Sequence, residues 1–152
     1  MRLRVIQKIL GLLLSIFSLA LLPPLLIAIF TEDGAGSAFA TAIVVSLSAG
    51  LALWIPVRRV EGDLKLRDGF LVVVLFWLVL GLSGSIPFVV ADEPRMSVAD
   101  AIFESISGLT TTGATVIVGI DGLPASILFY RQLLQWLGGM GIIVLAVAIL
   151  PM

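Results

Sequence analysis

The stretch of sequence that decides the fold is residues 98–115, which read VADAIFESISGLTTTGAT. Its first part carries apolar residues at a helical period, and Ser97 and Asp100 form a capping box at its start. This predicted helix has about 12 residues and a length of about 18 Å, so it is too short to cross a membrane core of about 30 Å. The sequence therefore predicts a short helix over 98–109, followed by an extended, polar and uncharged loop over 110–115.

The composition of the chain places this polar loop in an apolar setting. Of the 152 residues, 60% are hydrophobic and 12% are charged, whereas a soluble domain is about 45–50% apolar and about 25% charged. Both differences indicate a membrane protein. Polar backbone at membrane depth must be buried in protein or must line a water-filled path. The loop is therefore a candidate segment for binding an ion.

Four long apolar segments predict helices that cross the membrane. They cover residues 9–30, 37–57, 69–90 and 126–150. Each is long enough to span about 30 Å at about 1.5 Å per residue. We expect Pro23 and Pro24 to kink or break the first segment. The expected fold class is an all-α membrane protein with four transmembrane helices, a re-entrant pore helix and a filter loop.

The positions of lysine and arginine predict the orientation of these helices. Seven basic residues precede the first segment or lie between the second and third: Arg2, Arg4, Lys8, Arg58, Arg59, Lys65 and Arg67. Only Arg95 and Arg131 lie on the other side, and Arg131 is expected to snorkel to the outer interface beside Tyr130. Cytoplasmic loops carry an excess of basic residues. Both termini and the 58–68 loop are therefore predicted to be cytoplasmic, with the 91–125 connection outside.

The first segment has a second interpretation as a signal peptide. Basic residues precede its apolar run, and Ala38-Phe39-Ala40 resembles a cleavage site. The apolar region of a signal peptide is usually about 7–15 residues long. This segment is longer and contains two prolines, so a retained helix is favoured.

The hairpin predicted between the third and fourth segments has the chemistry of a cation site. A helix C-terminus carries about half a negative charge, and loop carbonyl oxygens can replace the water around an ion. Gly113 can adopt φ > 0, which lets successive carbonyls point at one axis. The residues predicted to bind the ion are Thr111, Thr112, Gly113, Ala114 and Thr115. Those assigned to the pore helix and its end are Asp100, Glu104, Leu109 and Thr110.

Three features of this region have alternative interpretations. The loop could be a polar surface turn after an interfacial helix, not a filter. Asp100 and Glu104 could serve the dipole and cap of the helix N-terminus, or they could attract cations in a vestibule. Gly138, Gly139 and Gly141 could allow ordinary close packing of helices, or they could make room for the hairpin.

The composition also argues against other classes of function. The chain has no cysteine and no histidine, so it lacks thiolate ligands and the commonest general base. No nucleophile and base converge in the sequence, and an enzyme is not expected. No basic patch predicts nucleic acid binding. We expect no cofactor, and the surrounding lipid is the expected environment.

Two blocks of sequence carry a resemblance to a known family. Residues 99–115 and residues 130–144 resemble the Trk/Ktr/HKT superfamily of potassium transport proteins and, within it, the bacterial TrkH-type membrane subunits. The resemblance implies two leading transmembrane helices over residues 1–57 and a cytoplasmic loop over 58–68. It further implies that residues 69–152 form the first of four membrane–pore–membrane repeats around one pore.

The same resemblance implies a site and partners. Thr111 to Thr115 would line one quarter of a selectivity filter for K⁺, with Gly113 at the filter-glycine position. In the family, glycine there is associated with K⁺ permeation and serine with Na⁺ preference. The family also implies a homodimer, a cytosolic nucleotide-binding regulatory subunit, and the bacterial plasma (inner) membrane as location.

The sequence departs from the family pattern by stopping after one repeat. A single hairpin supplies only a quarter of a filter, so we expect either a fragment of a longer protein or a chain that tetramerises, and the first is favoured. A non-conducting membrane scaffold or assembly subunit is the alternative function.

Overall fold

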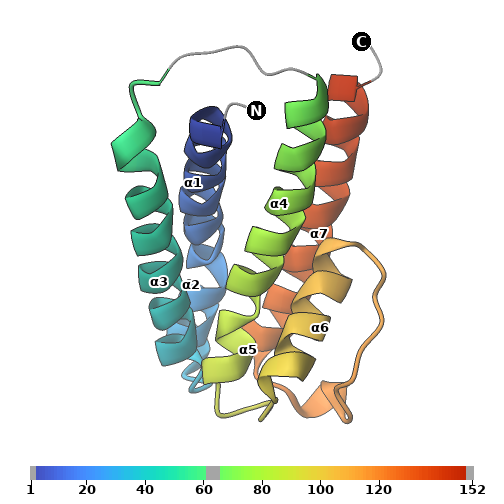
Figure 1. The fold of residues 1–152 in the computed structure, drawn as a ribbon. Coiled ribbons are helices and arrows are strands. Elements are labelled where there is room, and N and C mark those ends of the chain that lie inside the picture. Colours follow the sequence, from blue (N-terminus) through green and yellow to red (C-terminus); the bar gives the residue numbers. More distant parts are fainter. Residues whose placement is uncertain (1–2, 61–65, 150–152) are drawn as a thin grey trace.

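The computed structural model describes residues 3–60 and 66–149, and within these ranges every regular element is a helix. In chain order the elements are α1 (Leu3–Ala20), α2 (Leu22–Thr31), α3 (Gly36–Trp54), η1 (Ile55–Val57), α4 (Leu66–Gly84), α5 (Ile86–Val90), α6 (Val98–Leu109), η2 (Ile120–Gly122) and α7 (Ala125–Ile149) (Figure 1). The prediction of an all-helical protein is therefore confirmed for the described residues.

Three helical segments are long and apolar enough to cross a membrane. They are Leu3–Thr31, Gly36–Val57 and Asp68–Val90. Many large apolar side chains on these segments are exposed, as expected where lipid replaces water as the solvent. The fourth predicted segment coincides with α7, except for Leu150, which lies outside the described residues. The chain is thus a membrane protein, and the crossing by α7 stays a prediction.

The first helix begins earlier than the apolar pattern predicts. It starts at Leu3, whereas the uncharged segment starts at residue 9. Two polar side chains explain the extension, because Gln7 donates to the carbonyl of Leu53 at 3.0 Å and Lys8 donates to that of Val60 at 2.9 Å. The polar first turns of α1 thereby satisfy carbonyl groups at the end of α3 and just beyond it.

Prolines break two of the long segments. The first segment divides between α1 and α2 at Leu21, just before Pro23, as predicted. The third divides between α4 and α5 at Ser85, before Pro87, and this second break was missed. In both places the proline ring lacks an N–H and clashes with the carbonyl four residues earlier.

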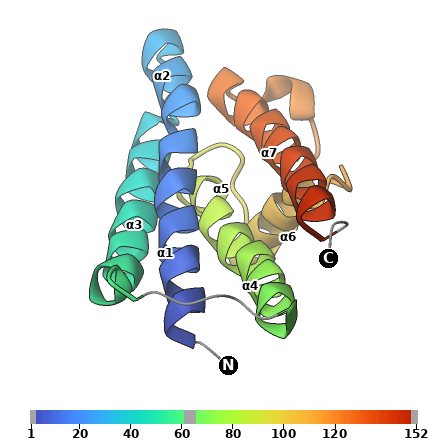
Figure 2. The same ribbon diagram turned by 90° about the horizontal axis from the view of Figure 1, so that it is seen from above.

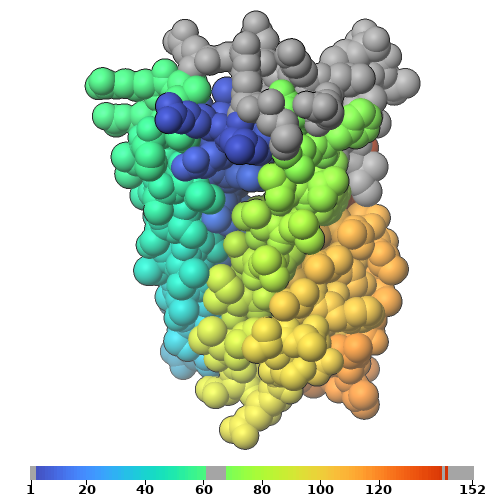
Figure 3. Space-filling view, in the orientation of Figure 1, coloured from blue at the N-terminus to red at the C-terminus, as the bar shows by residue number. Residues whose placement is uncertain are grey.

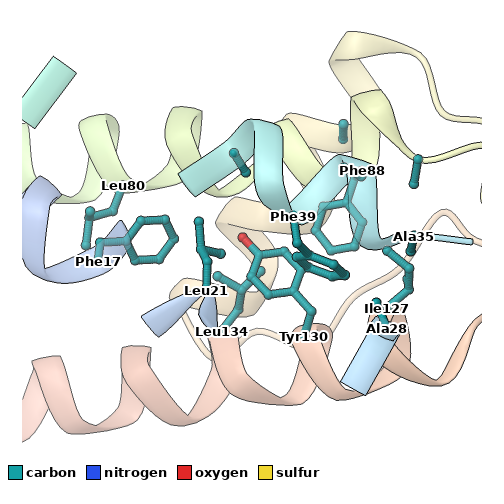
Figure 4. Packing of buried hydrophobic residues seen from close by; sticks show 14 of the residues in the cluster. Phe17, Leu21, Ala28, Ala35, Phe39, Leu80, Phe88, Ile127, Tyr130 and Leu134 are labelled. Atoms are coloured by element: carbon teal, nitrogen blue, oxygen red, sulfur yellow. The ribbon is translucent and has the colours of Figure 1, made fainter. Parts of the chain in front are cut away.

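The helices form two groups that share one core. Helices α1 and α3 pack side by side, and α4, α6 and α7 lie together beside them (Figure 2). Tyr130 of α7 joins the groups, with its ring centroid 5.4 Å from that of Phe39 and 5.2 Å from that of Phe88 (Figure 4). Its hydroxyl donates to the carbonyl of Gly84 at 2.8 Å. The leading helices therefore support the helix that backs the hairpin.

Candidate ion-binding hairpin

Helix α6 and the loop after it form a hairpin at one side of the bundle. In Figure 1, α6 starts near the end of the molecule that carries the α2–α3 turn, and the following loop returns to that same end at η2. The starts of α1 and α4 lie at the opposite end. The chain between α5 and α7 therefore enters and leaves the bundle on one side.

The start of α6 is capped by Ser97. Its hydroxyl accepts a hydrogen bond from the backbone N–H of Asp100 at 3.2 Å and donates to the Asp100 carboxylate at 2.7 Å. This is the N-cap that the sequence predicts. The Asp100 carboxylate is thus engaged at the helix start, where a negative charge is favoured.

The end of α6 turns by a Schellman motif. The N–H of Thr111 bonds to the carbonyl of Gly108 at 2.9 Å, and the N–H of Thr112 bonds to that of Ser107 at 3.0 Å. The motif requires a left-handed residue after the helix, and Thr111 takes this role with φ 56°. Glycine usually occupies such a position, so a threonine there carries no local signal for the turn. Gly113 has φ 73°, the positive φ expected for it.

The N–H groups of the loop point back at α6. Gly113 donates to the carbonyl of Ser107 at 3.3 Å, and Val116 donates to the carboxylate of Glu104 at 2.8 Å. The Ser107 hydroxyl donates to the carbonyl of Ala114 at 2.7 Å. The Thr115 hydroxyl also donates to Glu104. The loop is therefore held to α6 by the side chain and carbonyl of Ser107 and by the side chain of Glu104.

Most carbonyl oxygens of the loop are left without a partner. Within the part of the chain that the structure describes, no hydrogen bond is donated to the carbonyls of Thr111, Thr112, Gly113 or Thr115. All four residues are exposed. Figure 3 shows the hairpin on an uncovered face, next to α4. Unpaired carbonyl dipoles of this kind can coordinate a dehydrated monovalent cation.

Carboxylate clusters do not provide a second type of cation site. Among residues 3–60 and 66–149, no group of three or more His, Cys, Asp or Glu side chains could hold a metal ion.

Glu104 and Arg131 form a buried ion pair, contrary to the prediction for Arg131. The Arg131 Nε lies 3.3 Å from the Glu104 carboxylate, and the two side chains are 10% and 2% exposed. Arg131 therefore does not snorkel to the interface. Glu104 lies on the side of α6 that faces α7, where its carboxylate is bonded to Arg131, Thr115 and Val116. The pair could not be found from sequence spacing alone.

The three glycines of α7 have different surroundings. A Cβ at Gly138 would overlap the carbonyl oxygen of Leu109, the buried last residue of α6. At Gly139 a Cβ would lie 3.8 Å from the Thr111 side chain, and at Gly141 it would lie 3.9 Å from Phe76, both ordinary contacts. Of these three glycines, only Gly138 lies where the hairpin leaves no room for a Cβ.

The described helices and the hairpin together define an all-helical membrane protein. The family model described as "TrkH: Cation transport protein" matches residues 35–152. The chain belongs to the TrkH family.

Individual relatives agree with this assignment. The chain is 62% identical over 99% of its length to the Trk system potassium uptake protein TrkH of Vibrio parahaemolyticus. It is 57% identical over 99% of its length to TrkH of Escherichia coli K12, and 38% identical over 98% to TrkG of the same organism. It spans 31% of the length of each of these relatives.

A solved structure has the same fold. The crystal structure of the potassium transporter TrkH from Vibrio parahaemolyticus superposes with a TM-score of 0.95 at 62% sequence identity. The match covers 100% of this chain and 32% of that one.

Proposed function

We propose that the chain supplies the first filter segment of a pathway for K⁺ uptake across the membrane. Four helical segments would cross the bilayer, with α6 as a re-entrant pore helix and residues 110–115 as one quarter of the filter. Residues 1–57 would form the leading helix pair, 58–68 a cytoplasmic loop, and 69–152 the first repeat. Ions would move passively, driven by a membrane potential worth about 2.3 kcal/mol per charge per 100 mV.

The observation that carries the proposal is the orientation of the loop's peptide groups. The N–H groups of Thr112, Gly113 and Val116 bond to α6, while the carbonyls of Thr111, Thr112 and Gly113 accept no bond within the described residues. A cation site needs this arrangement, because carbonyl oxygens must replace the hydration shell of the ion. The relatives from Vibrio parahaemolyticus and Escherichia coli are named potassium uptake proteins, which supports K⁺ as the ion.

The proposal includes partners and a location. Three further filter segments would close the pore, as parts of the same protein. A homodimer and a cytosolic nucleotide-binding regulatory subunit follow from the family resemblance. The bacterial inner membrane is the proposed location, with both termini in the cytoplasm. The start of α1 and the described end of α7 lie at the same end of the bundle, which supports that topology (Figure 1).

Substitution of Gly113 by serine tests the filter. Within this chain a Cβ at Gly113 meets nothing within 4 Å, so the strain expected here comes from the positive φ of 73°. A side chain at positive φ costs about 1–2 kcal/mol, which should displace the neighbouring carbonyls. We expect Gly113→Ser, in the protein expressed from its complete gene, to lower the ratio of K⁺ to Na⁺ uptake.

Gly119→Ser is the matched control. Gly119 has φ 74° and equally open surroundings, but it lies outside residues 110–115. It should carry the same backbone strain and keep the uptake ratio. An unchanged ratio in Gly113→Ser would contradict the filter assignment.

Cysteine substitution across residues 108–118 separates the filter from a non-conducting scaffold. With an impermeant thiol reagent, a filter predicts partial labelling that K⁺ reduces. Uniform labelling that K⁺ does not affect would favour the scaffold.

A further inference from the structure

The Glu104 carboxylate connects the loop to α7 with both of its oxygens. One oxygen accepts hydrogen bonds from the Val116 N–H at 2.8 Å and from the Thr115 hydroxyl. The other lies 3.3 Å from Nε of Arg131. The exit end of the loop is therefore fixed to α7 through a single side chain.

The Glu104 side chain is closely surrounded by other groups. It is 2% exposed, and a cavity of only about 10 Å³ lies between the pair and Gly113. Such a volume holds about one water molecule at most. A buried carboxylate that loses its partner is strongly unfavourable. The position of Arg131 therefore determines the position of the carboxylate, and the carboxylate determines that of Thr115 and Val116.

The loop is thus anchored at two points. Ser107 holds its entry through the N–H groups of Thr112 and Gly113, and Glu104 holds its exit. The unpaired carbonyls lie between these anchors. Discrimination between K⁺ and Na⁺ by carbonyls depends on where the dipoles lie and how far they can move. A displaced exit anchor would change both.

We propose that Glu104 and Arg131 are positioning residues that set the ion selectivity of the 110–115 loop. This inference rests on the proposed filter function. Neither side chain touches the ion, and the opposite charges of the pair largely cancel at the loop. The pair acts by fixing the position of the loop. Shortening the Glu104 side chain should therefore change the selectivity even when its charge is kept.

The test compares three variants in the protein expressed from its complete gene, by the ratio of K⁺ to Na⁺ uptake in cells that lack their own K⁺ uptake. A ratio does not depend on the amount of protein. Glu104→Asp keeps the charge but shortens the side chain by one methylene. Glu104→Gln leaves Arg131 without a countercharge, and the double variant Glu104→Gln with Arg131→Gln removes both charges.

We expect Glu104→Asp and Glu104→Gln each to lower the ratio by about tenfold, which corresponds to losing about one hydrogen bond to a charged group. The double variant should recover part of this loss, because no buried charge is left unpaired. Glu93→Gln and Arg95→Gln are the matched controls. Both residues are exposed, and their substitutions remove the same charges as those at Glu104 and Arg131. Both control variants should keep the ratio of K⁺ to Na⁺ uptake.

Several outcomes would overturn the proposal. An unchanged ratio in both Glu104 variants, with Gly113→Ser still lowering it, would reject the positioning role and leave the filter function intact. An unchanged ratio in all of these variants would reject both. Absence from the membrane of every Glu104 and Arg131 variant would assign the pair to folding alone.

Discussion

Replacing Gly138 with alanine tests whether α7 and the hairpin pack backbone against backbone. A Cβ at Gly138 overlaps the carbonyl oxygen of Leu109 and lies 2.6 Å from its carbonyl carbon. Both are main-chain atoms at the end of α6, so no side-chain rotation relieves the overlap. Helices α6 and α7 must separate, or the Schellman turn must shift.

The expected effect is the difference of two terms. Overpacking a tightly packed site typically costs about 1–3 kcal/mol, and a contact with backbone belongs at the upper end of that range. Alanine gains about 0.5–1 kcal/mol over glycine within a helix. We therefore expect the Gly138→Ala variant to be less stable than the unchanged protein by about 2 kcal/mol. Thermal unfolding of the purified protein in detergent measures this, and the ratio of K⁺ to Na⁺ uptake should fall as the loop moves.

Gly139→Ala is the matched control on the same helix. Its Cβ would lie 3.8 Å from the Thr111 side chain, an ordinary contact. The stability of this variant should stay the same or rise by about 0.5–1 kcal/mol, because alanine favours a helix over glycine by that amount. Equal unfolding temperatures for the Gly138 and Gly139 variants would refute the reasoning, since the end of α6 would then not be held against α7.

Three further predictions concern the connections around the hairpin. Thr111→Gly should raise the stability by about 1 kcal/mol, because glycine tolerates the left-handed φ; a lower unfolding temperature would show that the threonine side chain compensates for it. The amide hydrogens of Thr112 and Val116, bonded to α6, should exchange with deuterium more slowly than that of Val118, which is 96% exposed; equal rates would contradict the loop anchors. Asp33→Ala should lower the stability by about 1 kcal/mol, since the Asp33 carboxylate accepts the Ser126 N–H of α7 at 2.9 Å and acts as its cap. Burial raises the pKa of Asp33, but hydrogen bonds from Ser126 and neighbouring groups outweigh it and hold the pKa below 3.8. The stabilisation is therefore complete above pH 3.8 and is lost as the pH falls through the lowered value, so a pH-independent difference between the two proteins would reject this account.

The parts of the fold that depend on local sequence could be predicted. The capping pattern at Ser97, the apolar period after it and the positive φ of Gly113 all follow from residues within a few positions of one another. The break before Pro23 has the same local origin. The break before Pro87 has the same cause, and the sequence before it, which includes Ser83, Gly84 and Ser85, also carries a local signal for it.

The pairing of the candidate site could not be predicted. Glu104 and Arg131 are separated by 27 positions, and Asp33 and Ser126 by 93. Such pairs depend on which helix faces which, and helical periodicity does not report this. The sequence suggested an exposed Arg131 because charges in membrane segments usually reach an interface. In the structure Arg131 is instead buried, because it pairs with Glu104 on the neighbouring helix α6.

The hydrogen bonds from Ser107 and Glu104 to the loop have a consequence for assembly. They join residues no more than 12 positions apart, so most contacts of the loop form within one segment of the chain, and Arg131 of α7 completes them through Glu104. Ordering a flexible loop during association would subtract from the free energy of association. Here that entropy is lost when the single hairpin folds. In the proposed pore, neighbouring filter segments would then meet as rigid bodies, and their contacts would need only to bring preformed rows of carbonyl groups together.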